Sequence, residues 1–269
     1  MIKVPIYKPK QGEHMKVACF MSGSGTNTRK IIENGLKSAS SYKVVLIYTD
    51  VRDDRLAKTG EKMCRAKDIA DEYDVNYECV DIRDFYAARG AKRTDLSIRP
   101  EFDRMVLDAI RPYRIDLIAN SGYMSIMTMP ILDEFDGRII NVHPADLTIR
   151  SGDERKYVGI HVVRDAILNG ETELRATSHV VREKVDHGEI LVVSEPVKVQ
   201  LPQGATVETL KEDEALLNKV VEEHQNKLKE RGDWVIYPLT IQLIGEGRIG
   251  LKNGIAYLNG KPKPNGIRP

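Results

Sequence analysis

With 269 residues, 41% of them apolar, the chain is long enough to bury one substantial core. Its 41 basic and 40 acidic side chains nearly cancel, which gives no electrostatic reason to expect nucleic acid or an anionic membrane as a partner. The three cysteines show no CxxC spacing, which favours a reducing compartment. Residues 1–14 contain no apolar core of signal-peptide length, and no apolar run is long enough to cross a bilayer. These observations predict a cytoplasmic protein.

The first half of the chain alternates predicted strands with predicted helices. Short apolar runs predict strands at Lys16–Met21, Lys43–Tyr48, Asn76–Val80, Ile115–Asn120 and Arg138–Val142. Helices are predicted at Thr28–Leu36 and Arg55–Tyr73, and at Phe102–Ile110, where Pro112 ends the helix. Residues 82–98 show no clear period and are interpreted as a surface excursion. Apolar strands that alternate with helices predict a parallel sheet covered by helices.

The pattern changes from about residue 175. Longer strands are predicted at Ala176–Val181 and Glu189–Val197, joined by a turn at Asp186–Gly188. One face of a long, charged helix carries Leu210, Leu217, Val221 and Leu228. The tail, Trp234–Pro269, is predicted to form a strand and then a hairpin through Asn253–Gly254.

The expected fold class is therefore α/β. We expect a Rossmann-like, mostly parallel twisted sheet with helices on both faces, extended by antiparallel C-terminal strands and a hairpin. No linker is evident, so an extension of residues 1–14 is expected to precede one domain, 15–269. Its first part, 15–145, is the predicted nucleotide-binding half, and 146–269 forms the remainder.

A glycine-containing loop lies between the first predicted strand and the first predicted helix. It consists of Gly23, Ser24, Gly25, Thr26 and Asn27. Glycines there let backbone N–H groups approach a phosphate, and the helix N-terminus adds positive potential. A tight strand–helix turn explains these residues equally well. Asp50 ends the second predicted strand, where dinucleotide-binding proteins carry an acid that binds the ribose. However, Thr28 replaces the third glycine of the dinucleotide fingerprint, and no Walker sequence follows the loop. A phosphomonoester is therefore the ligand that fits this loop better.

Polar residues also end the fifth predicted strand. Asn141 and His143 flank Val142 there, and strand alternation sends both side chains to one side, where an amide and an imidazole can hold an oxyanion. On these residues alone, a polar strand end that caps the next loop is the favoured interpretation. Asp186 lies in a Gly-containing turn, where an aspartate usually serves the local structure of the turn. The histidines between 143 and 187 show no metal-ligand spacing, so no metal is expected.

Taken in chain order, these segments resemble the folate-dependent formyltransferases. The matching segments are Gly23–Asn27, Gly122–Met124, Asn141–Pro144, Lys156–His161, Thr177–His179 and Asp186. The tail resembles the glycinamide ribonucleotide transformylase branch at Ile236–Leu239, Gly247–Arg248 and Ala256–Gly260. Nothing resembles the basic barrel of methionyl-tRNA formyltransferases or the regulatory domain of formyltetrahydrofolate hydrolases. The resemblance covers residues 15–264, with expected insertions near 50–65, 82–98 and 148–155.

This resemblance implies formyl transfer from 10-formyltetrahydrofolate to the amine of glycinamide ribonucleotide, a step of purine biosynthesis. It implies a catalytic set of Asn141, protonated His143 and Asp186, supported by His161 and His179. By resemblance, the phosphate is bound by Gly23, Ser24, Gly25, Thr26 and Asn27, and the ribose by Asp233. The pterin pocket is implied to be lined by Met124, Ser125, Ile126 and Met127 and by Glu183, Lys184 and Val185. No metal is implied.

Two alternatives stay open. One is a formyltransferase or formyltetrahydrofolate hydrolase with another acceptor, and the other is a non-catalytic nucleotide-binding module. The expected partners are small molecules rather than nucleic acid or membrane, and a homodimer stays open. Ser125 stands where the family carries arginine, so we expect the carrier to bind weakly or to be a modified pterin.

Overall fold

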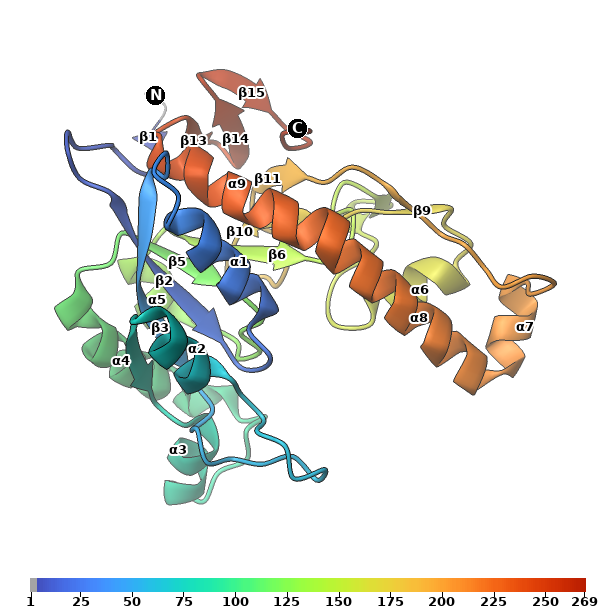
Figure 1. Ribbon diagram of the computed structural model, residues 1–269, viewed down its shortest axis with the longest axis horizontal. Helices are drawn as coiled ribbons and strands as arrows, with labels where there is room; N and C mark the ends of the chain where they lie inside the picture. Colours follow the sequence, from blue (N-terminus) through green and yellow to red (C-terminus); the bar gives the residue numbers. More distant parts are fainter. Residues whose placement is uncertain (1–3) are drawn as a thin grey trace. The chain divides into compact units, whose positions relative to one another are not determined.

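The computed structural model describes residues 4–269, which form two compact units. The N-terminal unit comprises Pro5–Asn141 and Ile241–Gly247. The C-terminal unit comprises Val142–Thr240 and Arg248–Pro269, together with Val4. Most helices and strands of both units are labelled in Figure 1.

The N-terminal unit is built on parallel strands. β2 (Met15–Met21) pairs with β3 (Tyr42–Thr49) and with β5 (Leu117–Asn120), β3 pairs with β4 (Asn76–Cys79), and β5 pairs with β6 (Ile139–His143). The central strands β2, β3 and β5 are buried along most of their length, which explains their continuous apolar sequences. The five strands predicted in the first half of the chain are therefore confirmed.

Helices connect and cover these strands (Figure 1). α1 (Thr26–Gly35) contacts β3, α2 (Ala66–Tyr73) contacts β3 and β4, and α4 (Arg99–Ile110) packs against α5 (Met129–Glu134). The prediction of a helix from Arg55 was wrong for its first eleven residues, because α2 begins only at Ala66. Gly60 in the preceding turns has φ +85°, which a right-handed helix excludes.

Residues 82–98 are more regular than expected. They contain α3 (Ile82–Ala88) and a short 3-10 helix (Leu96–Ile98). The Asp81 side chain caps α3 by accepting backbone hydrogen bonds from its first turn, and Phe85 packs edge-on against Phe102 of α4. The interpretation as a surface excursion was wrong for α3, where Ile82, Phe85 and Tyr86 are buried, whereas residues 87–97 lie at or near the surface as expected. A seven-residue helix is too short to show a period in the sequence.

The C-terminal unit carries antiparallel strands. β10 (Thr177–Val180) pairs with β11 (Ile190–Val193) across the turn that contains Asp186. Both strands are shorter than predicted, because β12 (Val197–Lys198) separates from β11 and pairs with β9 (Glu173–Leu174) instead. The central sheet has seven strands in the order β11-β10-β6-β5-β2-β3-β4. The expected α/β class with a mostly parallel sheet is confirmed.

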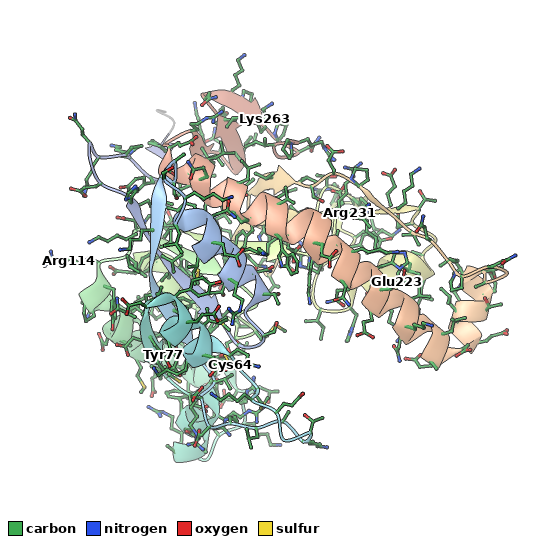
Figure 2. The ribbon with its side chains drawn as sticks, in the orientation of Figure 1. Cys64, Tyr77, Arg114, Glu223, Arg231 and Lys263 are labelled. Carbon is green, nitrogen blue, oxygen red and sulfur yellow. The ribbon has the colours of Figure 1, made fainter. Side chains whose placement is uncertain are left out.

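The predicted long helix is divided in two. α7 (Val207–Glu212) and α8 (Glu214–Leu228) meet at Asp213, whose side chain caps α8. The buried positions of the two helices are Leu210, Leu217, Val220, His224 and Leu228. The sequence placed Val221 on the buried face, but the buried residue is its neighbour Val220, and Val221 is only half-buried. Glu223 pairs with Lys227 at 2.7 Å on the exposed face (Figure 2).

The tail begins with a helix rather than a strand. α9 (Trp234–Gly245) follows a π-helical turn (Lys229–Asp233). The strand prediction was wrong because this helix is apolar all round and rich in β-branched and aromatic residues, so it shows no helical period. No helix within residues 4–269 has both the length and the apolar character needed to span a membrane.

The predicted C-terminal hairpin is confirmed. β13 (Ile249–Lys252) pairs with β14 (Ile255–Leu258), and β15 (Lys261–Lys263) extends the pair. Asn253 and Gly254 both have positive φ, as a two-residue turn of this type requires. Together with β1 (Val4–Pro5), these strands form a four-stranded sheet in the order β1-β13-β14-β15.

Candidate active site

Two histidines and one aspartate meet in the C-terminal unit. His143 ends β6, His179 lies in β10, and Asp186 lies in the turn after β10. His143 Nδ1 is 3.6 Å from one carboxylate oxygen of Asp186, and His179 Nε2 is 3.4 Å from the other. All three side chains are buried, with at most 8% of each residue exposed. Among residues 4–269, no group of three or more His, Cys, Asp or Glu is arranged to hold a metal ion.

The turn that carries Asp186 is held from several sides. Asp186 has φ 55°, a conformation that aspartate tolerates better than most residues. Its carboxylate accepts a hydrogen bond from the Gly159 N–H at 2.9 Å. Gly188 fits only as glycine, because a Cβ there would overlap the carbonyl oxygen of Val180. The carboxylate is therefore fixed between the two imidazoles.

The protonation states follow from burial and from these contacts. Burial opposes the charge of Asp186, but the hydrogen bond with His179, the charge of His143 and the Gly159 N–H lower the pKa of Asp186 to about 2. For His143, burial lowers the pKa, and this effect exceeds the opposing attraction of Asp186. The resemblance implied a protonated imidazole, whereas the structure favours a neutral His143 beside an ionised Asp186.

The neutral His143 ring has a defined tautomer. Its Nε2 lies 3.1 Å from the carbonyl oxygen of Tyr157. Because a carbonyl oxygen only accepts hydrogen bonds, Nε2 carries the proton. Nδ1, which faces Asp186, is then the atom that can take up a second proton.

The phosphate-type loop Gly23–Asn27 joins β2 to α1 in the N-terminal unit. Gly25 is the N-cap of α1 with φ 71°, and no side chain within the described residues caps this helix end. A Cβ at Gly25 would lie 2.6 Å from Met21 Cε and still closer to Ile69. A Cβ at Gly23 would meet nothing within 4 Å. Gly25 therefore serves packing, and Gly23 is the glycine beside open space.

A loop after β5 is tied to this region by a buried carboxylate. Asp50 accepts hydrogen bonds from Ser22 Oγ at 2.6 Å and from Ser125 Oγ. Ser22 Oγ also accepts from the Met124 N–H at 3.0 Å. Burial raises the pKa of Asp50, and the two serine hydrogen bonds offset only part of this effect. Asp50 thus organises the loop instead of presenting a free acid to a ribose, so the dinucleotide interpretation loses its support.

The same loop presents apolar side chains over a fixed backbone. The Ile126 carbonyl accepts a hydrogen bond from Arg99 at 3.0 Å, and Arg99 itself is 3% exposed. Met124 and Ile126 are 65% and 43% exposed, whereas Met127 is buried. Exposed apolar side chains beside ordered backbone polar groups are typical of sites for flat aromatic rings.

The other predicted site residues lie in different surroundings. Asn141 is half-buried in β6, two positions before His143. Asp233 is buried at the end of the π-helical turn. His161 is exposed directly before α6 (Val162–Leu168), and its side chain makes no hydrogen bond within the described residues. The exposed outer part of the Asp186 turn consists of Glu183, Lys184 and Val185.

Two residues of this region were missed by sequence reasoning. Arg155 contacts the Asp186 turn and Tyr157 contacts His143, both through backbone carbonyl groups. Because a backbone carbonyl is common to all residues, no side-chain pattern in the sequence could indicate these contacts. Tyr157 was part of the matching Lys156–His161 segment, but Arg155 lies in the expected insertion.

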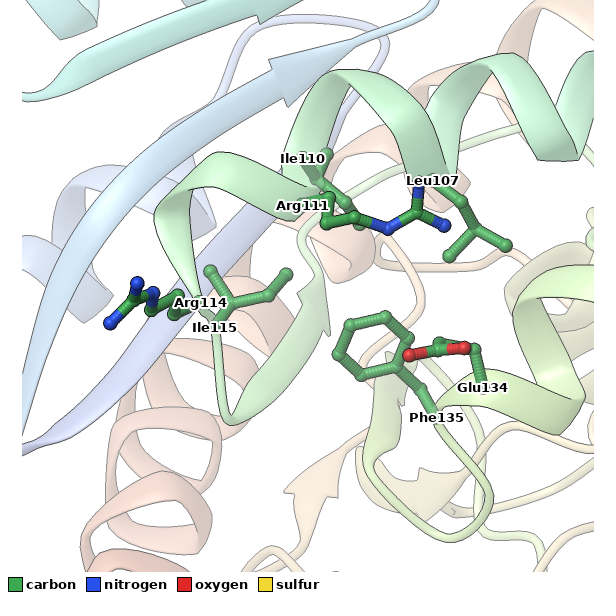
Figure 3. A pocket seen from close by; sticks show the side chains of 7 residues that line it. All are labelled: Leu107, Ile110, Arg111, Arg114, Ile115, Glu134 and Phe135. Carbon is green, nitrogen blue, oxygen red and sulfur yellow. The ribbon is translucent and has the colours of Figure 1, made fainter.

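A depression of about 110 Å³ in the N-terminal unit is separate from these groups (Figure 3). Its lining residues are Leu107, Ile110, Arg111, Arg114, Ile115, Glu134 and Phe135. Arg114 and Ile115 precede β5 and lie at its amino end, whereas the loops at Gly23–Asn27 and at 122–127 follow the carboxyl ends of β2 and β5. Parallel α/β sheets bind ligands at the carboxyl ends of their strands, so these loops are the better candidates.

The chain resembles known proteins along most of its length. A family profile described as formyl transferase matches residues 15–221. A phosphoribosylglycinamide formyltransferase of Haemophilus influenzae is 29% identical over 249 residues, covering 93% of this chain and 96% of that protein. Glycinamide ribonucleotide transformylase 1 from Symbiobacterium toebii matches with a TM-score of 0.64 and 25% identity, covering 92% of this chain and 95% of that one. The phosphoribosylglycinamide formyltransferase from Coxiella burnetii has the same fold, with a TM-score of 0.66 at 23% identity over 95% of this chain and 99% of that one.

Proposed function

The chain belongs to the formyl transferase family, and on that premise we propose that it transfers the formyl group of 10-formyltetrahydrofolate to the primary amine of glycinamide ribonucleotide. The observation that carries the proposal is the buried pairing of His143 and His179 with Asp186. Two relatives that match over more than nine-tenths of both chains are named for this acceptor, and they support its choice. The products are tetrahydrofolate and the formylated ribonucleotide.

Formyl transfer to an amine passes through a tetrahedral intermediate. The amine nitrogen attacks the formyl carbon, the carbonyl electrons move to oxygen, and the bond from carbon to N10 then breaks as N10 takes up a proton. In our proposal the Asn141 amide donates a hydrogen bond to this oxyanion. Removal of one such donor typically lowers the rate by about 10²–10³. His143 lies two positions further along the same strand, so strand alternation directs both side chains to one side.

We assign the proton transfer to His143. Its neutral form accepts a proton at Nδ1 as the amine attacks, and the same proton then passes to N10. Asp186, 3.6 Å from Nδ1, stabilises the imidazolium that forms between these two steps. His179 holds the second carboxylate oxygen at 3.4 Å and so orients Asp186.

Substrate binding is assigned to loops of each unit, as the family resemblance implies. Backbone N–H groups of Gly23–Asn27 and the N-terminus of α1 suit a phosphomonoester. Asp233 is assigned to the ribose hydroxyl groups. The pterin ring is assigned to the loop at 124–127 and to Glu183, Lys184 and Val185, with backbone groups as its hydrogen-bond partners.

The test follows both products from the purified chain. 10-Formyltetrahydrofolate is supplied with and without glycinamide ribonucleotide, and formylated ribonucleotide, tetrahydrofolate and formate are quantified by mass spectrometry. We expect formylated ribonucleotide and tetrahydrofolate in equal amounts, formed only when the ribonucleotide is present. Formate released at the same rate without the ribonucleotide would identify a hydrolase and refute the acceptor. No consumption of the carrier in either arm would refute formyl transfer itself.

A further inference from the structure

A short hairpin lies against the turn that carries Asp186. It consists of β7 (Arg150–Ser151) and β8 (Glu154–Arg155). The Arg155 guanidinium donates one hydrogen bond to the carbonyl oxygen of Asp186 and another to that of Gly188 at 2.8 Å. One planar group therefore bridges the two ends of the three-residue turn.

The residue next to Arg155 contacts the same turn through its side chain. The Glu154 carboxylate accepts from Lys184 Nζ at 2.6 Å and from His187 Nε2 at 2.9 Å. Glu154 and Lys184 are both exposed, so these ion pairs contribute little to stability. Arg155 is only half-exposed and bonds to the backbone itself, so it is the stronger attachment of the hairpin.

We propose that Arg155 is a positioning residue for His143 and Asp186: it fixes the turn through two backbone carbonyls and places a permanent positive charge at that turn. This inference rests on the proposed function, because it concerns the same pair of side chains. It adds a role that belongs to the hairpin at 150–155, which lies in the segment expected to be an insertion.

The first part of the proposal concerns geometry. Val185 on the outer side of the turn is 52% exposed, so packing does not hold that side. Without Arg155, Asp186 keeps its contacts with Gly159, His143 and His179. Displacement of a reacting group by about 1 Å can lower a rate roughly 10²-fold. Fixing the backbone of Asp186 therefore matters for catalysis more than for folding.

The second part concerns charge. The groups that face His143 are Asp186 from the turn, His179 from β10, the Tyr157 carbonyl after β8, and Arg155 from β8. Burial lowers the pKa of His143 most, Asp186 and the Tyr157 carbonyl raise it, and the charges of His179 and Arg155 lower it further. Removing the Arg155 charge should therefore raise the pKa of His143 and leave more imidazolium at neutral pH, where a base is needed.

Two substitutions separate geometry from charge. Arg155→Gln removes the charge and the two-point contact, whereas Arg155→Lys keeps the charge but cannot bond both carbonyls equally well. Arg150→Gln is the matched control, because Arg150 is an exposed arginine of the same hairpin that bonds to the Asp153 carbonyl within the hairpin. Each variant is studied by ¹⁵N NMR titration of the His143 imidazole and by the pH profile of kcat.

We expect the His143 midpoint to move to higher pH in Arg155→Gln and to stay at the wild-type value in Arg155→Lys. We expect kcat to fall about tenfold or more in both variants, with KM nearly unchanged. Arg150→Gln should change neither quantity. A wild-type midpoint in Arg155→Gln, or an equal shift in Arg150→Gln, would overturn the charge role, and wild-type kcat in Arg155→Lys would overturn the geometric role.

Failure of the proposed function remains distinguishable from failure of this inference. If the wild-type chain forms no formylated ribonucleotide, the NMR titration still reports whether Arg155 controls His143. If Arg155→Gln does not fold, Arg155→Lys decides alone: a lowered kcat supports the geometric role and an unchanged kcat refutes it.

Discussion

Replacing Asp186 by asparagine removes the charge between the two histidines while leaving the turn intact. Asparagine tolerates the φ of 55°, and its amide oxygen can still accept the Gly159 hydrogen bond. Despite burial, the contacts with His179, His143 and Gly159 lower the pKa of Asp186 from 3.8 to about 2. A shift of this size corresponds to at most about 2 kcal/mol of stability at neutral pH, because the part that comes from the charge of His143 is lost once the imidazole is neutral. We therefore expect Asp186→Asn to lose up to about 2 kcal/mol of unfolding free energy at pH 7 and to remain folded.

This contribution depends on pH in a defined direction. The pKa of Asp186 is lower in the folded chain than in the unfolded one, so the stabilisation is complete well above pH 3.8 and disappears as the pH falls toward 2. Chemical denaturation of wild type and variant measures it. The difference measured at pH 7 should shrink as the pH falls through 3.8 toward 2. Glu189→Gln is the matched control, because it removes a carboxylate from the end of the same turn, where Glu189 pairs with Arg182 at 2.9 Å.

The activity of Asp186→Asn should fall much further than its stability. Without the carboxylate, the imidazolium of His143 loses its stabilising charge, and general acid–base catalysis typically contributes about 10²–10⁴ in rate. Steady-state kinetics with both substrates should show this loss in kcat. Near-wild-type kcat in the purified variant would remove Asp186 from the mechanism. Equal unfolding free energies at pH 7 would separately refute the contribution of the Asp186 carboxylate to stability.

Two further predictions concern the phosphate loop and the pH profile. Gly25→Ala should lower Tm, because the new Cβ would lie 2.6 Å from Met21 Cε at a residue whose φ is 71°. Gly23→Ala should leave Tm unchanged and raise KM for the ribonucleotide. Equal Tm values in the two variants would contradict this division of roles between the glycines. Because burial lowers the pKa of His143 from 6.5, the acidic limb of kcat/KM should lie below pH 6.5, and a limb measured above that value would show that the imidazolium is favoured instead.

Much of the fold followed from the sequence because its strands are buried and short. Runs such as Lys43–Tyr48 are apolar after their first residue and end in turn residues, so each strand could be recognised by itself. α9 could not, because a helix that is apolar all round has no polar face to reveal its period. α3 was missed for the opposite reason, since its seven residues are too few to repeat a pattern.

The residues of the candidate site also differ in how far the sequence alone could predict them. Asn141 and His143 flank Val142 at the end of one predicted strand, so their shared direction followed from alternation alone. Asp186 lies about forty residues further along, and only the family resemblance connected it with His143 before the 3.6 Å separation was known. Arg155 had no such guide, because its partners are backbone carbonyls more than thirty residues away. Contacts of this kind depend on tertiary structure and leave no local pattern.

Ser125 stands where the family resemblance places an arginine, and the structure shows what the serine does instead. Its hydroxyl donates to the buried Asp50 carboxylate, whose other oxygen accepts from Ser22 at 2.6 Å. The one hydrogen-bond donor of the Ser125 side chain is therefore used within the protein, so Ser125 can contact a carrier only through its backbone or as an acceptor at its hydroxyl oxygen.

A charge-assisted hydrogen bond is typically worth about 1.5–3 kcal/mol, so we predict that 10-formyltetrahydrofolate binds roughly ten- to a hundredfold more weakly than to a relative with the arginine. Calorimetric titration with the carrier or a stable analogue measures this affinity, and Ser125→Ala is the matched control. Ser125→Ala should bind the carrier as weakly as wild type, because the lost hydrogen bond is internal. Low-micromolar or tighter binding by the wild-type chain would contradict the prediction, since the backbone of the loop at 124–127 would then suffice for the standard carrier. Weak binding of this carrier together with tight binding of a modified pterin would instead place the difference at the ring, next to the exposed side chains of Met124 and Ile126.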